Sequence, residues 1–295
     1  MSRSPGPKTP ANTRPSSSPT FAVAFGGGGA RGLAHIHVIE ALDELGIRPV
    51  AISGSSIGAI MGAGMAAGMA GKEIHEYARS IFNNRTELAA RMWRARPGSF
   101  AEMLERGRNL AQFNIERILA AFLPDQIPQD FAALEIPLQV TATDFYGHCL
   151  QVLREGDLRS ALAASAAIPA LFRPVRRNGI ILIDGGFFNP VPFDLVKPLA
   201  DITLAIDVVG APEKSKRAMP GTVDLMFGAS QLMMQSVTAQ KLTTQHPDIL
   251  LRPPVSKFRV LDFLKIDSVL AETASLKDDV KRSVAEVLER REGAR

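Results

Sequence analysis

Residues that could carry out a nucleophilic reaction cluster in the segment Gly54-Ser55-Ser56-Ile57-Gly58, which has the spacing G-x-S-x-G around Ser56. A strand-like run (49–53) precedes it, and an apolar stretch begins at Ile57. In that context the serine sits on a tight turn between a strand and a helix, with its hydroxyl presented as a nucleophile. Glycines flank it because a β-carbon there would collide with the strand or the helix. The same residues also suit a turn in which Ser55 or Ser56 only caps the helix.

A carboxylate that could act as a base ends the apolar run in Ile181-Leu182-Ile183-Asp184-Gly185-Gly186. An acid in that position is costly to bury without a partner. One interpretation is a turn-forming Asp-Gly pair. The other is that Asp184 lies beside Ser56, because both follow strands whose carboxyl ends meet at one edge of a parallel sheet. Asp184 would then take the serine proton directly.

A glycine-rich loop, Gly26-Gly27-Gly28-Gly29-Ala30-Arg31-Gly32, also lies between a strand and a helix. Its successive amides could bind the phosphate of a nucleotide or the oxyanion of an ester's tetrahedral intermediate. The spacing of Gly27, Gly29 and Gly32 fits G-x-G-x-x-G, but the next strand carries no acid at its end, and Arg31-Gly32 stands where a P-loop has Lys-Ser/Thr. The loop therefore favours an oxyanion hole over a nucleotide site.

The elements that must position these segments follow from an alternation of strand-like and helix-like stretches from Phe21 onward. This alternation is typical of βαβ units around a mainly parallel sheet, and it predicts one α/β domain. The expected strands are residues 21–25, 49–53, 138–143, 149–153, 179–183 and 202–208, with another near 250. The expected helices are residues 33–45, 57–69, 158–167, 191–199, 223–244 and 268–290.

The remaining segments give the expected domain organisation. Residues 1–20 are rich in Pro, Ser and Thr without an apolar run, which predicts a disordered leader, and residues 21–295 form the domain. Residues 72–137 read as a helical insertion. The small, apolar stretch 57–71 is about 15 residues long, shorter than the ~20 that a membrane span needs, so a buried helix is expected.

The amino-acid composition limits which binding partners and which cellular compartment are expected. The single cysteine, Cys149, cannot form an internal disulfide and suggests a cytoplasmic protein. With 34 Lys and Arg against 30 Asp and Glu, the net charge of +4 is too small to indicate a nucleic-acid partner. The five histidines show no metal-ligand spacing, so neither a metal nor another cofactor is expected. The sequence specifies no oligomeric state.

Together the three glycine-flanked segments resemble the patatin-like phospholipases, which are lipid acyl hydrolases with a Ser-Asp dyad. Other stretches also resemble the bacterial branch of that family: Ala142-Thr143-Asp144, the run 164–169 leading to Phe172-Arg173-Pro174-Val175, and Asn189-Pro190-Val191-Pro192. The resemblance covers about residues 21–208. It implies a three-layer α/β/α fold with a mainly parallel central sheet, and a lipid or fatty-acyl ester as substrate.

Carried over position by position, the resemblance implies Ser56 as nucleophile and Asp184 as base. The amides of Gly27, Gly28 and Gly29 would be the oxyanion donors, and Arg31 would brace their loop. Because an aspartate is ordinarily a poor base for a serine hydroxyl, the site must be dry enough to raise the pKa of Asp184. His37 replaces the family's usual small residue and would alter how the first helix packs.

Three alternatives stay open on the sequence. The order Ser56, Asp184, His246 matches the order of an α/β-hydrolase triad. A serine-linked acyl group could also pass to an alcohol, which would make the protein an acyltransferase. The third alternative is a lipid-binding module that keeps the fold without catalysis.

The segment 79–117 carries eight arginines against four glutamates, together with the only tryptophan, Trp93. Basic and aromatic residues on helices suit a lid that docks onto an anionic lipid surface. A solvated helical face with its aromatics turned into the core explains the same pattern.

Overall fold

The computed structural model describes residues 18–95, 113–213 and 219–293. Most of the expected leader and part of the segment 79–117 lie outside these residues. The strands are β1 (Phe21–Phe25), β2 (Ala51–Ser55), β3 (Leu138–Asp144), β4 (Cys149–Leu153), β5 (Val175–Arg177), β6 (Ile180–Asp184), β7 (Ile202–Ile206) and β8 (Ile249–Leu251). They form one sheet in the order β5-β6-β3-β2-β1-β7-β8, with β4 paired to β3.

The sheet is parallel from β3 through β2, β1 and β7 to β8, and antiparallel where β4, β5 and β6 join. Side chains alternate along β1 between the two faces of the sheet, and all of them are buried, so both faces of the sheet are covered. Phe21, Val23 and Phe25 enter the larger core, whereas Ala22 and Ala24 face a smaller one. A parallel sheet buried on both faces is the central layer of a three-layer α/β/α fold, as predicted.

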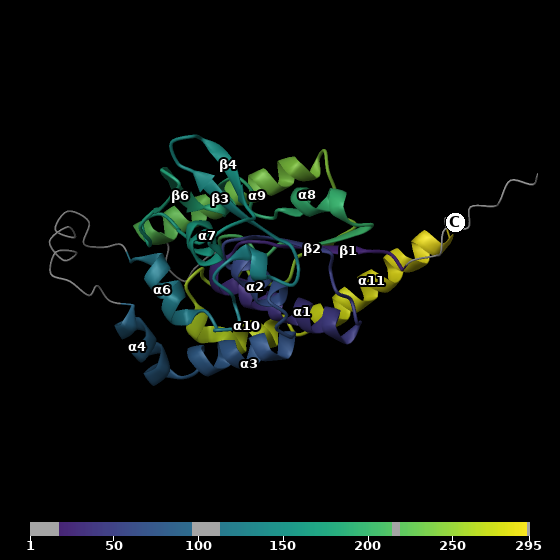
Figure 1. The fold of residues 1–295 in the computed structure, drawn as a ribbon, viewed down its shortest axis with the longest axis horizontal. Helices are drawn as coiled ribbons and strands as arrows, with labels where there is room; N and C mark the ends of the chain where they lie inside the picture. The colour runs from purple at the N-terminus through teal and green to yellow at the C-terminus, as the bar shows by residue number, and fades with distance from the viewer. Residues whose placement is uncertain (1–17, 96–112, 214–218, 294–295) are drawn as a thin grey trace, which may run out of the picture.

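Helices pack on both faces of the sheet (Figure 1). The larger core lies against α1 (His35–Glu44), α2 (Ile57–Ala66), α3 (Gly71–Phe82), α7 (Leu158–Ser165), α10 (Ile266–Glu272) and α11 (Leu276–Gly293). The opposite face carries α8 (Phe193–Val196) and α9 (Thr222–Leu242). Two more helices, α4 (Arg85–Arg94) and α6 (Ile115–Phe122), lie beside α3 at the end of the molecule where the parallel strands end.

Several predicted boundaries differ from the structure because tertiary pairing decides them. Pairing with β1 and β3 extends β2 to Ser55, so the strand runs directly into the turn at Ser56. The strand β5 was not expected; it is only three residues long and pairs with β6. The predicted helix 191–199 is a short helix followed by a 3₁₀ turn, and the predicted helix 268–290 is broken between α10 and α11.

Among the described residues, no helix combines the length and the apolar character that crossing a bilayer requires. The apolar helix α2 packs instead against β1, β2 and β3.

Candidate active site

Ser56 and Asp184 meet because two strands end against each other along one edge of β3. Residues 140–144 of β3 pair with β4 on one edge, so β2 and β6 share the other edge. Ser55 of β2 pairs with Thr141, and Asp184 of β6 pairs with the next residue, Ala142. The two chains therefore approach from opposite directions, and their carboxyl ends bring Ser56 beside Asp184.

Ser56 and Asp184 lie together as expected, but for a different reason from the one inferred from the sequence. Asp184 was expected at the carboxyl edge of a parallel sheet, but β6 is antiparallel to β3. The apolar run 179–183 predicted the strand to within one residue at each end, yet a strand's direction relative to its neighbours depends on contacts distant in sequence.

Ser56 occupies a strained turn between β2 and α2. Its φ of 53° lies in the left-handed region, which costs a residue with a β-carbon roughly 1 to 3 kcal/mol. Its backbone N–H donates to Ser165 Oγ over 2.8 Å, so a fully buried serine at the end of α7 holds the turn. Gly58 is required because a β-carbon would lie 2.2 Å from the Phe25 carbonyl oxygen, and the same holds at Gly54, where it would lie 2.5 Å from Ala59 Cα.

Asp184 is 2% exposed and is oriented by its own turn. The Gly186 N–H donates to its Oδ1 over 2.7 Å, and the Ser56 side chain lies close enough to the carboxylate to interact with it. Burial raises the pKa of Asp184 from 3.8 to about 6, although both neighbours pull that pKa down. Gly185 follows directly, and a β-carbon on it would lie 2.3 Å from the Thr141 carbonyl oxygen.

The glycine loop lies against Ser56, and its amides are not equivalent. Gly27 N–H donates to the Pro190 carbonyl over 2.9 Å, so this expected oxyanion donor is already engaged. The amides of Gly28 and Gly29 make no hydrogen bond to another described residue. Gly29 is the first residue of a 3₁₀ helix, Gly29–Ala34, where unpaired N–H groups are normal. These two amides are the donors that remain available.

Arg31 is buried and braces the loop from behind. Its Nε donates to the Phe258 carbonyl over 2.7 Å and its Nη1 to the Val209 carbonyl over 2.6 Å. Burial lowers the pKa of Arg31 from 12.5 to about 10, and the group stays charged at neutral pH. Gly32 lets the 3₁₀ helix approach Ile57, whose Cγ2 would lie 2.4 Å from a β-carbon.

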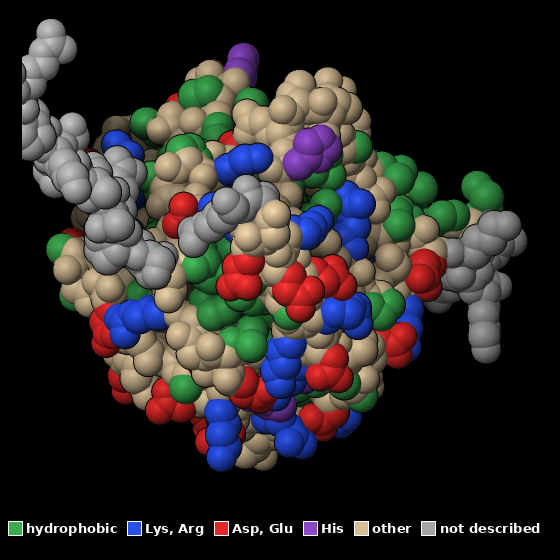
Figure 2. All heavy atoms as spheres, turned by 90° about the vertical axis from the view of Figure 1, so that its right-hand side faces the viewer, with side chains coloured by type: hydrophobic (Ala, Val, Ile, Leu, Met, Phe, Trp, Pro, Cys, Tyr) green, Lys and Arg blue, Asp and Glu red, His purple; other side chains and the backbone are tan. Residues whose placement is uncertain are grey.

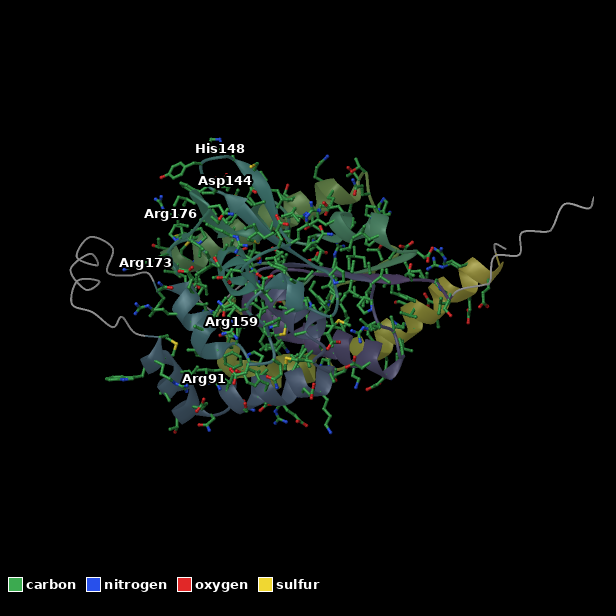
Figure 3. All side chains as sticks on the ribbon, viewed as in Figure 1. Arg91, Asp144, His148, Arg159, Arg173 and Arg176 are labelled. Carbon is green, nitrogen blue, oxygen red and sulfur yellow. The ribbon has the colours of Figure 1, made fainter. Side chains whose placement is uncertain are left out.

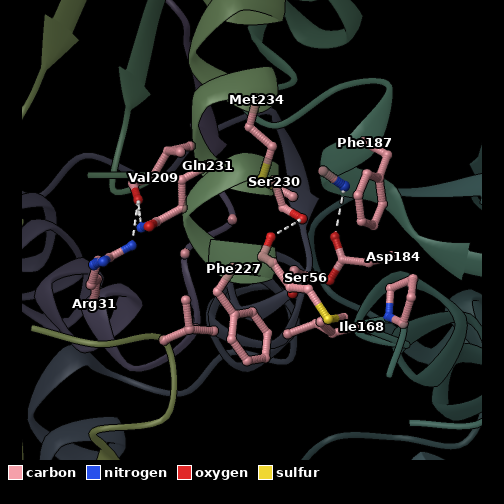
Figure 4. A pocket seen from close by; sticks show the side chains of 17 residues that line it. Arg31, Ser56, Ile168, Asp184, Phe187, Val209, Phe227, Ser230, Gln231 and Met234 are labelled. Atoms are coloured by element: carbon pink, nitrogen blue, oxygen red, sulfur yellow. Dashed lines mark hydrogen bonds between the residues drawn. The ribbon is translucent and has the colours of Figure 1, made fainter. Parts of the chain in front are cut away.

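A small cavity of about 100 Å³ joins these groups, and α9 covers it (Figure 4). No sequence pattern indicated this contribution, because α9 begins more than 160 residues after Ser56 and carries no motif. Gln231 Nε2 donates to the Val209 carbonyl over 3.2 Å, so α9 is tied to the same carbonyl as Arg31. The described residues of α9 that line the cavity are Met226, Phe227, Ser230, Gln231 and Met234.

No histidine is among the described residues that line the small cavity. His246 is exposed and precedes β8, hence lies at the amino end of the parallel strands, whereas Ser56 follows the carboxyl end of β2. His35 is fully buried, donates Nε2–H to the Gly26 carbonyl over 2.8 Å, and burial lowers its pKa to about 4. His37 donates to the Leu270 carbonyl over 3.0 Å and so ties α1 to α10.

A sequence model of the family described as patatin-like phospholipase matches residues 23–197, which include Ser56, Asp184 and the glycine loop. The chain belongs to this family. An uncharacterized NTE family protein of Mycobacterium tuberculosis is 37% identical over 200 residues, 67% of this chain and 51% of that protein. The chain thus spans about half the length of the mycobacterial relatives it matches.

Other similar proteins share less sequence with this chain. Patatin-like phospholipase domain-containing protein 6 of Homo sapiens is 28% identical over 287 residues, 85% of this chain and 19% of the human protein. Among solved structures, VipD of Legionella pneumophila has a TM-score of 0.41 and 14% sequence identity, and the match covers 87% of this chain and 67% of VipD.

Proposed function

We propose that this chain hydrolyses carboxylic esters of lipids, with Ser56 as nucleophile and Asp184 as its base. The observation that carries the proposal is the buried pair itself: the strand pairing brings Ser56 beside Asp184, a carboxylate whose pKa burial raises to about 6. A carboxylate with that pKa is a better proton acceptor than an exposed one and is still mostly ionised at neutral pH. Family membership supports a lipid ester as the substrate.

The proposed reaction proceeds in two steps. Ser56 Oγ attacks the acyl carbonyl carbon while Asp184 takes the hydroxyl proton, and the negative charge on the former carbonyl oxygen faces the amides of Gly28 and Gly29. The ester C–O bond then breaks, and Asp184 gives its proton to the leaving alcohol. Water releases the acyl group from Ser56 by the same sequence, with Asp184 again acting as base. Two preorganised amides typically contribute about 3 kcal/mol each to stabilising such an oxyanion.

Hydrolysis of p-nitrophenyl butyrate tests the proposal. Ser56→Ala and Asp184→Asn should each lower kcat by about a thousandfold or more, because neither partner is effective without the other. His246→Ala, a matched control outside the cavity, should keep wild-type kcat. Loss of activity in His246→Ala with the fold intact would instead support a triad, and a wild type that is inert towards esters would support a lipid-binding module.

A further inference from the structure

A second and larger cavity, of about 520 Å³, reaches Ser56 from the opposite side to α9. Its described lining residues are glycines or carry apolar side chains, apart from Ser56 and Tyr77. The Tyr77 hydroxyl already donates to the Phe122 carbonyl over 3.0 Å. The lining therefore offers almost no free polar group except the serine itself.

Helices of the segment 72–137 form one wall of the cavity, and α2 forms another. One stripe of α2 faces the cavity at Ile57, Ile60, Met61 and Gly64, the spacing of a single helix face. With a rise of about 1.5 Å per residue, Gly64 lies about 12 Å along α2 from Ser56. Opposite this stripe stand side chains of α3, α4 and α6, including Ala78, Ile81, Leu88, Met92, Ile118 and Leu119.

The wall is held in shape by contacts between these helices. Phe82 of α3 stacks on Phe122 of α6, with ring centroids 6.4 Å apart, and on Phe263, with centroids 5.2 Å apart. Arg91 of α4 donates to the Tyr77 hydroxyl and to the Ala121 carbonyl, joining α4 to α3 and α6. Arg91 lies at the end of the molecule where these helices are found (Figure 3). The cavity is thus preformed rather than a gap between loose helices.

An apolar cavity of this size needs an apolar occupant. Protein interiors are close-packed and hold few voids larger than a water molecule. Water is a poor filler, since a buried water needs two or more polar partners that this lining does not supply. The occupant must also connect to Ser56, whose hydroxyl lies at the junction of the two cavities.

We propose that this cavity binds the long hydrocarbon chain of the acyl group that Ser56 attacks, and that substrates with one long acyl chain are preferred. The second part follows from the contrast between the cavities. The smaller one, about 100 Å³, is bordered by apolar side chains as well as by Arg31, Ser230 and Gln231, and its volume leaves room for a small leaving group but not for a second long chain. The proposal rests on the proposed function for its chemistry, while the cavity's preference for a chain is testable without catalysis.

Ala78 is the position at which the cavity's capacity is best tested. It is 6% exposed, lies on α3 and lines the cavity, so a phenylalanine there would occupy space meant for the chain. Ala90 provides a matched control, because it is exposed on the neighbouring α4 and does not line the cavity. In a Ser56→Ala background, which prevents covalent chemistry, palmitate binding is measured by calorimetry for Ala78→Phe and Ala90→Phe.

Ala78→Phe should weaken palmitate binding by about tenfold to a hundredfold, since several methylenes lose their burial, while Ala90→Phe leaves binding unchanged. If Ala78→Phe does not fold, Ile118→Phe on α6 makes the same test from a partly exposed position. Undiminished palmitate binding in folded Ala78→Phe and Ile118→Phe, or no palmitate binding by the parent protein, would overturn the proposal.

The catalytic version of the experiment separates the two proposals. With Ser56 present, Ala78→Phe should lower kcat/KM for p-nitrophenyl palmitate about tenfold or more relative to kcat/KM for p-nitrophenyl butyrate, while Ala90→Phe leaves both values unchanged. If palmitate binds as expected but no ester is hydrolysed, the proposed function fails and the chain-binding cavity stands. If butyrate is hydrolysed and Ala78→Phe affects both esters equally, the cavity proposal fails and the proposed function stands.

Discussion

Burial makes Asp184 a stronger base and, by the same physics, a destabilising residue. Moving an aspartate out of water disfavours its charged form, so its pKa rises. Here the rise to about 6 occurs although the nearby Ser56 side chain and the Gly186 N–H, which donates to the carboxylate, both lower the pKa. The site thus combines a carboxylate that accepts protons near neutral pH with a backbone donor that keeps it oriented.

The first consequence concerns the pH dependence of activity. Below pH 6 Asp184 is protonated and cannot accept the Ser56 proton, so kcat/KM for p-nitrophenyl butyrate should rise with pH and level off above an inflection near 6. Because an ordinary histidine also titrates near that pH, the profile is repeated for His148→Ala and His246→Ala, which should keep the inflection. An inflection that disappears in either variant would assign it to that histidine.

The second consequence concerns stability. The raised pKa of Asp184 means that its charged form is disfavoured in the folded state, so stability present at low pH is lost as pH rises through about 6. A shift from 3.8 to about 6 corresponds to a cost of about 3 kcal/mol above that pH. Asp184→Asn should therefore unfold at a higher urea concentration than wild type near about pH 8, and the difference should vanish near about pH 3. An Asn variant less stable than wild type at the higher pH would contradict this reading.

At the scale of elements, α9 shows what the sequence predicted and what it did not. Its length was predicted within two residues, but the residues that face inward were not. Gln231 and Thr238 are buried, whereas Leu225, Leu232 and Met233 are each more than half exposed. Apolar periodicity ordinarily marks the buried face of a helix, and here the helix is held by polar contacts to loop carbonyls instead. Its role at the site therefore could not be read from the pattern.

The strand-turn-helix segments were predictable for the opposite reason. Gly54, Gly58 and Gly185 are needed because backbone atoms lie too close to leave room for a β-carbon. Those atoms belong to the following helical turn or to an adjacent strand, so the motif by itself indicates the local geometry. The engagement of the Gly27 amide with Pro190 joins residues 163 positions apart, and the antiparallel direction of β6 depends on pairs such as Ala142 and Asp184, which are 42 positions apart. Such pairings leave no trace in local spacing.

Lys241, at the end of α9, joins this helix to the loop that follows Asp184. Its ammonium group contacts Asp194, Asn189 and the Val191 carbonyl, and burial lowers its pKa. The neighbouring Pro190 carbonyl accepts a hydrogen bond from the Gly27 N–H, so the contacts of Lys241 support the glycine loop indirectly. We regard Lys241 as a positioning residue.

Lys241→Met should lower the free energy of unfolding by about 2 kcal/mol, because Asp194 loses its buried partner. It should also lower kcat for p-nitrophenyl butyrate while leaving KM unchanged, since the loop shifts and the substrate's contacts remain. Lys197→Met, at an exposed position, is the matched control and should change neither quantity. If kcat is unchanged while stability falls, Lys241 is purely structural; partial rescue by Lys241→Arg would support positioning.

In the molecule as a whole, the candidate active site and the packing of the last helix, α11, lie at different ends. The site follows the carboxyl ends of β1 and β2, whereas α11 packs on α1 and beside β8. The face at the α11 end carries basic and acidic side chains interspersed, with no large area of one sign (Figure 2). Glu44 of α1, for example, contacts both Lys277 and Lys281 of α11.

The helix α11 should therefore matter for folding and not for catalysis. Val284 is 3% exposed and lies within the larger core, so Val284→Ala should lower the free energy of unfolding by about 2 kcal/mol through lost burial and the cavity left behind. Val223→Ala, the same change at a position of α9 that is 64% exposed, should be near neutral. Because no described residue of α11 lines either cavity, kcat for p-nitrophenyl butyrate measured well below the melting temperature should equal that of wild type in both variants. A fall in kcat for folded Val284→Ala would mean that strain at this end reaches Ser56 through the sheet.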